Sequence, residues 1–103
     1  MVQELTSKEF NEFIKKEVVL IDFHAHWCMP CVMMSPIVDE ISKKFRGKIK
    51  VGKINIDENN ELAQKYNIRS IPNFIIFKNG KVVDQFIGSI SKEEFEKRIK
   101  KYL

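Results

Sequence analysis

One stretch of the chain, residues 18–23, is apolar at all but one position and most constrains the fold. It reads Val18-Val19-Leu20-Ile21-Asp22-Phe23. A strand with one solvated face alternates apolar and polar residues, whereas a nearly continuous apolar run is typical of a strand that is buried on both faces. We therefore predict a doubly buried strand here, with a single carboxylate inside it.

Helix-start signals and apolar residues at helical spacing predict four helices. The first and last begin at capping-box sequences, Thr6-Ser7-Lys8-Glu9 and Ser91-Lys92-Glu93-Glu94. The second follows the cysteine pair described below, contains Pro36, which should kink it, and stops at Gly47. The third begins at Asn59 or Asn60 and runs to Tyr66, with Asn67 as a left-handed end.

Three further segments predict strands, and their order defines the fold class. These are residues 49–56, residues 74–77 and residues 82–87, the last two joined by the turn Lys78-Asn79-Gly80-Lys81. The predicted order is helix, strand, helix, strand, helix, strand, strand, helix. This order implies an α/β protein whose central mixed sheet is flanked by helices on both faces. With 103 residues, we expect one domain covering residues 1–103.

The charge pattern argues against several kinds of partner. The net charge is +4, yet no block of five or six like charges occurs, so we expect no nucleic-acid or membrane partner. The apolar runs are too short to span a bilayer, and the segment Met1–Leu5 lacks the apolar core of a signal peptide. These features predict a cytoplasmic, reducing location.

Cys28 and Cys31 are the only two cysteines in the chain. A lone Cys-x-x-Cys pair is a redox couple, half of a metal site or a tight structural disulfide. As a structural staple, so short a loop stabilises a fold by only about 2 kcal/mol, whereas a long loop gives about 4 kcal/mol or more. In a reducing compartment such a pair is more often catalytic or metal-binding, and we favour the redox couple.

The position of the pair at a strand-to-helix junction favours redox chemistry. Free N–H groups and the helix dipole stabilise an anion at Cys28, and a thiolate is the nucleophile in disulfide exchange. Pro30 suits the first helical turn, where its missing N–H costs nothing. Cys31 is expected to lie one turn deeper, as a resolving thiol should.

Asp22 has two interpretations from the sequence. A carboxylate inside an apolar strand should be desolvated, which raises its pKa. Because it precedes Cys28 by six residues, it could lie beneath the helix start and exchange protons with Cys31. Alternatively, it is a strand-end residue that faces solvent or caps a neighbouring loop.

An ordered set of motifs gives the chain a resemblance to a known family. The set comprises Val19-Leu20-Ile21-Asp22-Phe23, Trp27-Cys28-Met29-Pro30-Cys31, Pro36, Lys53-Ile54-Asn55-Ile56-Asp57, Arg69-Ser70-Ile71-Pro72, Phe77-Lys78-Asn79-Gly80 and Gly88. In order and spacing these resemble the thioredoxin family over essentially the whole chain. The resemblance implies a thioredoxin fold and a thiol-disulfide oxidoreductase without a cofactor.

The resemblance also assigns roles to individual residues. It implies that Cys28 is the attacking thiol, Cys31 the resolving thiol and Asp22 a buried proton acceptor that Lys53 approaches. Alternatively, Lys53 is a solvated strand lysine. It further implies a cis Ile71-Pro72 bond, with the main chain of Ile71 pairing with an extended substrate peptide. The residues expected to shape the site around the cysteines are Trp27, Met29, Pro30, Ile71, Pro72 and Gly88, with Trp27 and Pro72 as the apolar rim.

The chain departs from the family pattern around the cysteines. Met29 replaces the usual glycine, Asn73 follows Pro72 where threonine is more usual, and His24 and His26 flank Ala25. The histidines have three interpretations: they tune the redox potential, they are simply packed or solvent-facing, or they form a zinc site with the two cysteines. We expect no metal. Met33 and Met34 are expected to fill the core and its edge, and the alternative is that they form a substrate surface.

The leading functional hypothesis is a monomeric protein-disulfide reductase. It would receive electrons from a thioredoxin-reductase-type donor and pass them to oxidised proteins. One alternative is a more oxidising enzyme or isomerase of the same fold, and another is a non-enzymatic binding subunit. An intact dithiol argues against the binding subunit, because a pure scaffold does not need both cysteines.

Overall fold

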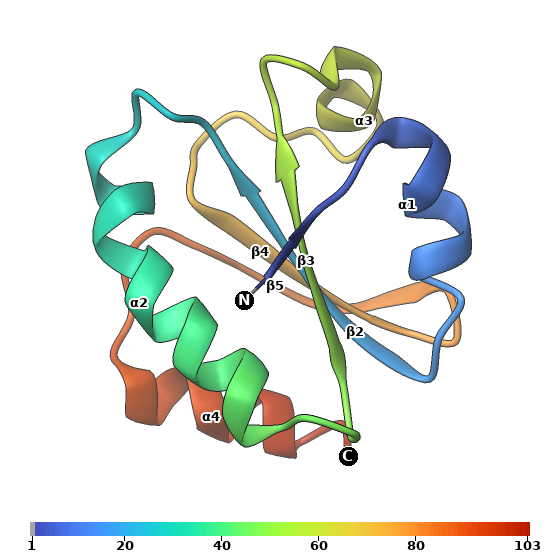
Figure 1. Ribbon diagram of the computed structural model, residues 1–103, viewed down its shortest axis with the longest axis vertical. Coiled ribbons are helices and arrows are strands. Elements are labelled where there is room, and N and C mark those ends of the chain that lie inside the picture. The colour runs from blue at the N-terminus through green and yellow to red at the C-terminus, as the bar shows by residue number, and fades with distance from the viewer. Residues whose placement is uncertain (1) are drawn as a thin grey trace.

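The computed structural model describes residues 2–103, so that only Met1 of the predicted domain lies outside it. Its sheet has the strand order β1-β3-β2-β4-β5 (Figure 1). Strands β1, β2 and β3 are parallel, and β4 is antiparallel to both β2 and β5. The elements are β1 (Gln3–Glu4), α1 (Ser7–Phe13), β2 (Val18–His24), α2 (Met29–Lys44), β3 (Lys50–Asn55), α3 (Asn60–Lys65), β4 (Asn73–Lys78), β5 (Lys81–Ile87) and α4 (Lys92–Lys100).

Strand β2 is the central strand, and all seven of its residues are buried. Successive side chains of a strand point to opposite faces, so Val18 and Leu20 join the apolar cluster under α2 and α4. Val19 and Ile21 join the cluster on the other face, under α1 and α3. Figure 1 shows the two helix pairs on opposite sides of the sheet. The predicted doubly buried strand and mixed sheet are confirmed.

The helix starts agree with the sequence in part. The capping box of α1 is complete, since Thr6 Oγ1 accepts from the Glu9 N–H and Glu9 accepts from the Thr6 N–H. At α4 only the Ser91 side chain caps, accepting from the Glu94 N–H at 3.1 Å. The predicted cap of α3 is wrong in its chemistry: Asn59 holds the N-cap position but makes no side-chain cap bond. Its side chain instead donates to the Asn55 carbonyl and accepts from the Ser7 hydroxyl.

The hairpin β4–β5 is confirmed with its turn. Asn79 and Gly80 both have positive φ, 53° and 83°, as a two-residue type I′ turn requires. Strand β1 was missed because two exposed residues, Gln3 and Glu4, carry no alternation or apolar pattern. It is recognised only through its parallel pairing with β3.

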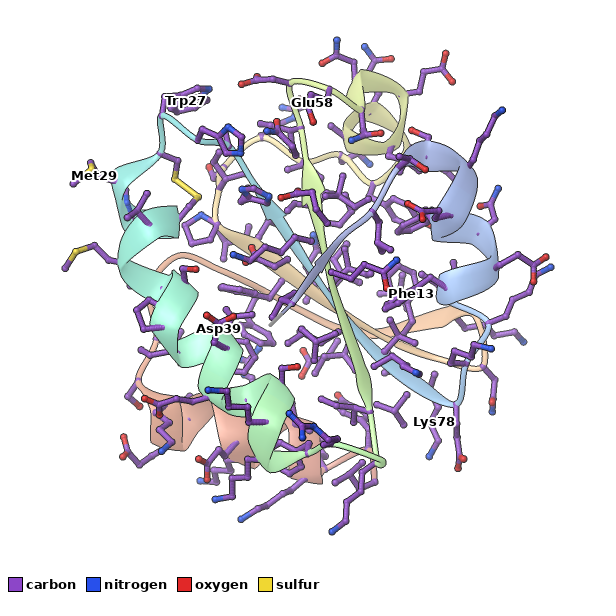
Figure 2. The ribbon with its side chains drawn as sticks, viewed as in Figure 1. Phe13, Trp27, Met29, Asp39, Glu58 and Lys78 are labelled. Atoms are coloured by element: carbon purple, nitrogen blue, oxygen red, sulfur yellow. A yellow bond between two sulfur atoms is a disulfide. The ribbon has the colours of Figure 1, made fainter. Side chains whose placement is uncertain are left out.

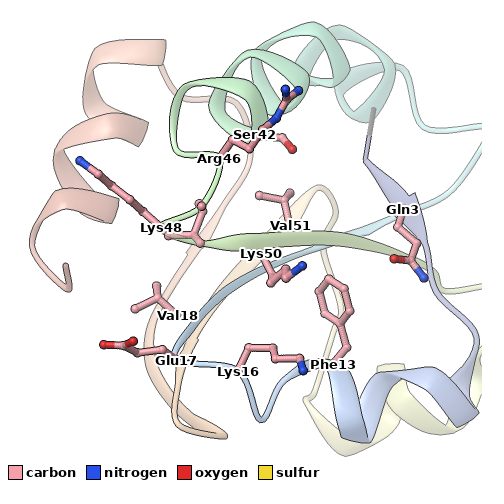
Figure 3. A pocket seen from close by; sticks show the side chains of 12 residues that line it. Gln3, Phe13, Lys16, Glu17, Val18, Ser42, Arg46, Lys48, Lys50 and Val51 are labelled. Carbon is pink, nitrogen blue, oxygen red and sulfur yellow. The ribbon is translucent and has the colours of Figure 1, made fainter.

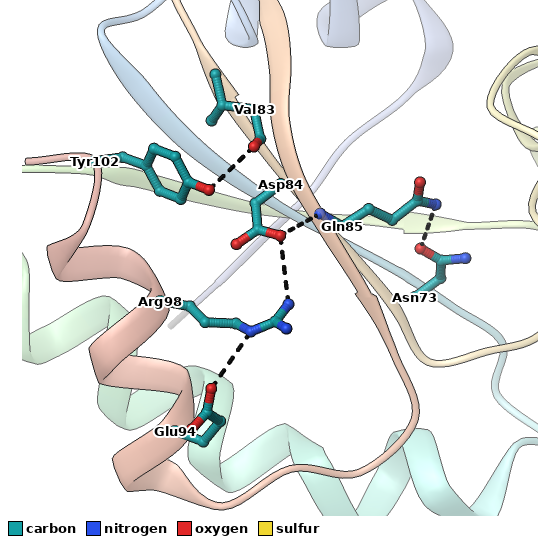
Figure 4. Close-up of polar contacts among 7 residues, drawn as sticks. All are labelled: Asn73, Val83, Asp84, Gln85, Glu94, Arg98 and Tyr102. Atoms are coloured by element: carbon teal, nitrogen blue, oxygen red, sulfur yellow. Dashed lines mark hydrogen bonds and ion pairs between the residues drawn. The ribbon is translucent and has the colours of Figure 1, made fainter.

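Helix α4 packs on β5 through apolar side chains, and an ion pair and a hydrogen bond lie at the edge of this contact. Phe95 packs against Phe74 and Phe86, with ring centroids 5.0 and 5.2 Å apart, and supplies the buried contact. Around it, Arg98 pairs with Asp84 at 3.4 Å, and the Tyr102 hydroxyl donates to the Val83 carbonyl (Figure 4). Because the polar groups are partly exposed, we expect the aromatic packing to contribute more stability than the ion pair does.

The helices formed by residues 2–103 are not membrane-spanning helices, since none combines the length and apolar character that crossing a bilayer requires.

Gly52 provides a test of the packing between β3 and the α1 face. A Cβ at this position would lie 2.6 Å from Leu5 Cδ1 and 3.1 Å from the Phe13 ring. We expect Gly52→Ala to lower the free energy of unfolding by about 1–3 kcal/mol, because overpacking forces neighbouring side chains to move. Urea denaturation measures this. In a Leu5→Ala background the same substitution should cost less; an equal cost in both backgrounds would contradict the steric explanation.

Candidate active site

Cys28 and Cys31 form a disulfide where β2 leads into α2 (Figure 2). Their Cα atoms are 5.2 Å apart, within the usual range for a disulfide. Cys28 is the N-cap residue of α2, with extended backbone, and its Sγ accepts from the Cys31 N–H at 3.2 Å. Pro30 lies in the first turn, as predicted. A sulfur at this place faces the unpaired N–H groups of a helix start, which favours negative charge on it.

The two cysteines are buried to a similar extent, but they have different neighbours. Cys28 is 4% exposed and Cys31 is 6% exposed, so the expectation that Cys31 lies deeper is wrong for the disulfide form. The Sγ of Cys28 lies 3.8 Å from the Ile71 carbonyl oxygen. Cys31 instead lines a cavity of about 250 Å³ that also borders Asp22. The helical spacing predicts which residues share a face, but exposure depends on how the disulfide packs against the loops.

The loop before β4 meets the cysteines as the resemblance implies. The Ile71-Pro72 peptide bond is cis, which confirms the expectation. The Pro72 carbonyl accepts from the Gly88 N–H at 2.8 Å, and Gly88 has a φ of 90°, where glycine is favoured. The expectation that Pro72 forms part of an exposed apolar rim is wrong, because Pro72 is buried.

The exposed apolar surface beside the cysteines comes from the start of α2 and the preceding loop. Trp27, Met29, Val32 and Met33 are 68%, 66%, 52% and 69% exposed. Met34 fills the core as expected, but the prediction for Met33 is wrong. The inner face of α2 carries Cys31, Met34, Val38 and Ile41, and Met33 points about 100° away from Met34.

Trp27 has a polar partner that the sequence analysis missed. Its indole Nε1–H donates to Asp57 Oδ2 at 2.8 Å. Asp57 ends the Lys53–Asp57 motif, but nothing in its spacing relates it to Trp27, thirty residues earlier. This bond fixes the orientation of an otherwise exposed ring beside Cys28.

Asp22 occupies a core position in β2, and it is only 2% exposed. The solvent-facing interpretation is therefore wrong. Burial raises the pKa of the Asp22 carboxyl to about 6, because the ionised form is poorly solvated there. His24 and Lys53 act in the opposite direction, and the Glu4 carboxylate adds a smaller upward contribution. Among the groups of residues 2–103, none hydrogen-bonds Asp22 Oδ1.

Lys53 lies beside Asp22 in the sheet, in register with it across β2 and β3. Its Nζ, however, donates to the Ser35 hydroxyl of α2 at 3.1 Å. Lys53 thus supplies positive charge near the carboxylate while its hydrogen bond goes to the helix above. The sequence analysis missed Ser35, which carries no signal apart from its place in α2.

The two histidines have different environments. His24 is 7% exposed, and its Nε2 lies 2.8 Å from Glu4 Oε2, whereas His26 is exposed. Their ring centroids are 5.8 Å apart. His24 is therefore a packed residue with a carboxylate partner, and Glu4 was missed because β1 was missed. Within residues 2–103, no group of three or more His, Cys, Asp or Glu residues is arranged to hold a metal ion.

A larger cavity, of about 430 Å³, lies away from this chemistry (Figure 3). It is bordered by Val18 at the start of β2 and by Lys50 and Val51 at the start of β3. The cysteines follow the other end of β2. The size of a cavity therefore does not identify the reactive site. We assign the reactive site to the smaller cavity, because Cys31 and Asp22 border it.

Three comparisons with known proteins agree with this geometry. The family model described as Thioredoxin matches residues 1–101. Thioredoxin 1 of Nostoc sp. is 49% identical over 102 residues, covering 97% of this chain and 95% of that protein. A chloroplastic M-type thioredoxin of Pisum sativum is 42% identical, covering 99% of this chain and 60% of that protein. A solved Plasmodium falciparum thioredoxin is 36% identical with a TM-score of 0.90, covering 99% of this chain and all of that chain.

A disulfide at the N-terminus of a helix, on a sheet of this topology, defines a thiol-disulfide oxidoreductase with a thioredoxin fold. The chain belongs to the thioredoxin family. Membership implies a reductase-type electron donor and disulfide substrates in general, and it favours neither the oxidant nor the binding-subunit alternative.

The burial of Asp22 predicts a pH-dependent gain in stability when the carboxylate is replaced. Its pKa rises from 3.8 in the unfolded chain to about 6, so folding favours the protonated form. The stability this provides is complete below pH 4 and is lost as the pH rises through 6. A difference of about two pKa units corresponds to about 3 kcal/mol.

We therefore expect Asp22→Asn to raise the free energy of unfolding by about 1–3 kcal/mol at pH 7.5, with the smaller value applying if the buried amide lacks partners. Near pH 4 the gain should largely vanish. Urea denaturation of both proteins at the two pH values measures the difference. A gain that is equal at both pH values would show that charge burial is not its cause.

Proposed function

We propose that the chain reduces protein disulfides, with Cys28 as the attacking thiolate and Cys31 as the resolving thiol. The single observation that supports this assignment most is the difference between the two sulfurs' surroundings. Cys28 lies beside the Ile71 carbonyl and the exposed Trp27 and Met29, whereas Cys31 borders the cavity of Asp22. An incoming disulfide approaches from the exposed side, so it meets Cys28 first.

The reaction follows from these positions in two exchanges. The Cys28 thiolate attacks one sulfur of the substrate disulfide, so that a mixed disulfide forms and the other substrate sulfur leaves as a thiolate. Cys31 then loses its proton and attacks Cys28 Sγ. This second exchange forms the Cys28–Cys31 disulfide and releases the remaining substrate sulfur. Two electrons pass from the dithiol to the substrate.

Asp22 is proposed as the acceptor of the Cys31 proton. A general base is most effective when its pKa is near the working pH, and the burial of Asp22 moves its pKa to about 6. Lys53, in register with Asp22, balances the charge of the ionised carboxylate. The cavity that Asp22 and Cys31 share gives the proton a path between the two residues.

The substrate surface is proposed to combine a backbone acceptor with an adaptable apolar patch. An extended peptide would pair with the main chain of Ile71, next to Cys28. Trp27, Met29, Val32 and Met33 would contact its side chains, and flexible methionines suit varied partners. Gly88 and buried Pro72 hold the Ile71 loop in place.

We further propose a single-domain monomer that works in the cytoplasm and receives electrons from a thioredoxin-reductase-type donor. A lone redox pair suits a reducing compartment, and the exposed apolar patch beside the cysteines consists of four side chains. The chloroplastic location is a property of the pea relative. Reduction of the purified protein by candidate donors, and light scattering for its mass, test these points.

The two cysteines are expected to respond differently to serine substitution. Cys28→Ser should abolish insulin reduction, because the attacking sulfur is lost. Cys31→Ser should also stop turnover but should accumulate a covalent protein–substrate adduct, because the mixed disulfide cannot be resolved. Mass spectrometry detects the adduct and identifies the sulfur that carries it. An adduct trapped by Cys28→Ser instead would reverse the proposed roles, and full activity in either variant would contradict the dithiol mechanism.

A further inference from the structure

A row of charged side chains crosses three strands beside the cysteines. Glu4 of β1 is in register with Lys53 of β3, which is in register with Asp22 of β2. Paired residues of neighbouring strands point to the same face, here the face covered by α2. His24 lies two residues beyond Asp22 on β2, so it projects from this face as well.

His24 connects this row to the protein surface. Its Nε2 lies 2.8 Å from Glu4 Oε2, so the pair spans the intervening strand β3. The His24 side chain is 9% exposed, whereas the Glu4 side chain is 48% exposed. The imidazole is therefore buried beside Asp22, and the carboxylate that holds it reaches solvent.

One cavity joins these groups to the reacting sulfur. Its lining includes Asp22, His24, Glu4, Lys53 and Cys31. Its volume, about 250 Å³, gives room for several water molecules at about 30 Å³ each. Protons can thus move between Asp22 and His24 through water, although the two side chains are not hydrogen-bonded to each other.

Asp22 needs such a route because it is almost completely buried. A carboxyl that takes a proton from Cys31 has to lose it before it can accept another. Lys53 is a poor route, since its ammonium donates to Ser35 and has no lone pair. From α2, only the uncharged Cys31, Val32 and Ser35 border the cavity. An imidazole can accept on one nitrogen while it donates from the other.

We propose that His24, held by Glu4, is the proton outlet of Asp22. This inference rests on the role of Asp22 proposed above. When the disulfide closes, the proton of Asp22 passes through cavity water to His24 Nδ1, and the proton on His24 Nε2 leaves by way of Glu4 to bulk water. Reduction of the disulfide by the donor runs the same path inward, which returns one proton to Cys31 and restores the His24 tautomer. His24 is thus a positioning residue that acts through Asp22.

The exchange rate of the Asp22 proton separates this role from a purely structural one. A structural role, in which the His24–Glu4 pair only holds β1 against the sheet, would change where the Asp22 carboxyl titrates or how stable the fold is. It would change the rate at which a proton enters and leaves only as far as the titration midpoint itself moves. Carbon-13 NMR of the Asp22 carboxyl in the oxidised protein gives both quantities, the titration midpoint and, from line broadening at that midpoint, the exchange rate.

In the native protein we expect one sharp resonance that moves continuously with pH. In His24→Gln the resonance should broaden at its midpoint as exchange slows by about tenfold or more, and added imidazole should sharpen it again. Glu4→Gln should broaden it in the same direction to a smaller extent, and it protects the test if His24→Gln folds poorly. His26→Gln is the matched control, because exposed His26 also borders the cavity but should leave the line width unchanged.

Unchanged line widths in both His24→Gln and Glu4→Gln would overturn the proposal, as would broadening in His26→Gln as large as in His24→Gln. Broadening that imidazole does not relieve would also overturn it, because a missing proton carrier should be replaceable. A native midpoint near pH 4 would instead contradict the proposed function of Asp22. The midpoint and the line width therefore test the two proposals separately.

Discussion

The burial of Asp22 in the central strand is the constraint on which the rest of the site depends. Strand β2 is covered on both faces, so a carboxylate in it cannot reach bulk water. Its raised pKa follows from that burial, and His24 and Lys53 beside it act to lower the pKa again. The same burial places Asp22 beside Cys31, on the wall of a shared cavity. The residue that costs stability at neutral pH is therefore the one that we propose exchanges protons with Cys31.

The α2 N-terminus and the Ile71 loop both contact the sulfur of Cys28. The helix start holds Cys28 Sγ against the Cys31 N–H, which favours a thiolate. The loop brings the Ile71 carbonyl to the same sulfur from the other side. In the proposed mechanism, substrate contact is centred on Cys28 and proton exchange on Cys31, which borders the cavity of Asp22.

Much of the fold was predictable because its signals are local. The apolar run of β2, the capping box at Thr6 and the Asn79-Gly80 turn each depend on neighbouring residues, and all three are confirmed. Strand β1 was missed because its two residues carry no local strand signal and form a strand only by pairing with β3. The sequence also did not predict three polar partners of site residues, namely Glu4, Ser35 and Asp57. Each partner lies far along the chain from the site residue it contacts, and no sequence periodicity relates the two. Met33 was misassigned because residues adjacent in a helix face different directions.

The pH dependence of the reduction potential tests most directly whether Asp22 is coupled to the dithiol. The potential should be measured against glutathione from pH 5 to pH 8 for the native protein and for Asp22→Asn. If Asp22 is coupled to the dithiol, the slope of the native potential changes near pH 6, where the carboxyl of the oxidised protein titrates, and this change is absent in Asp22→Asn. The same slope in both proteins throughout this range would contradict it.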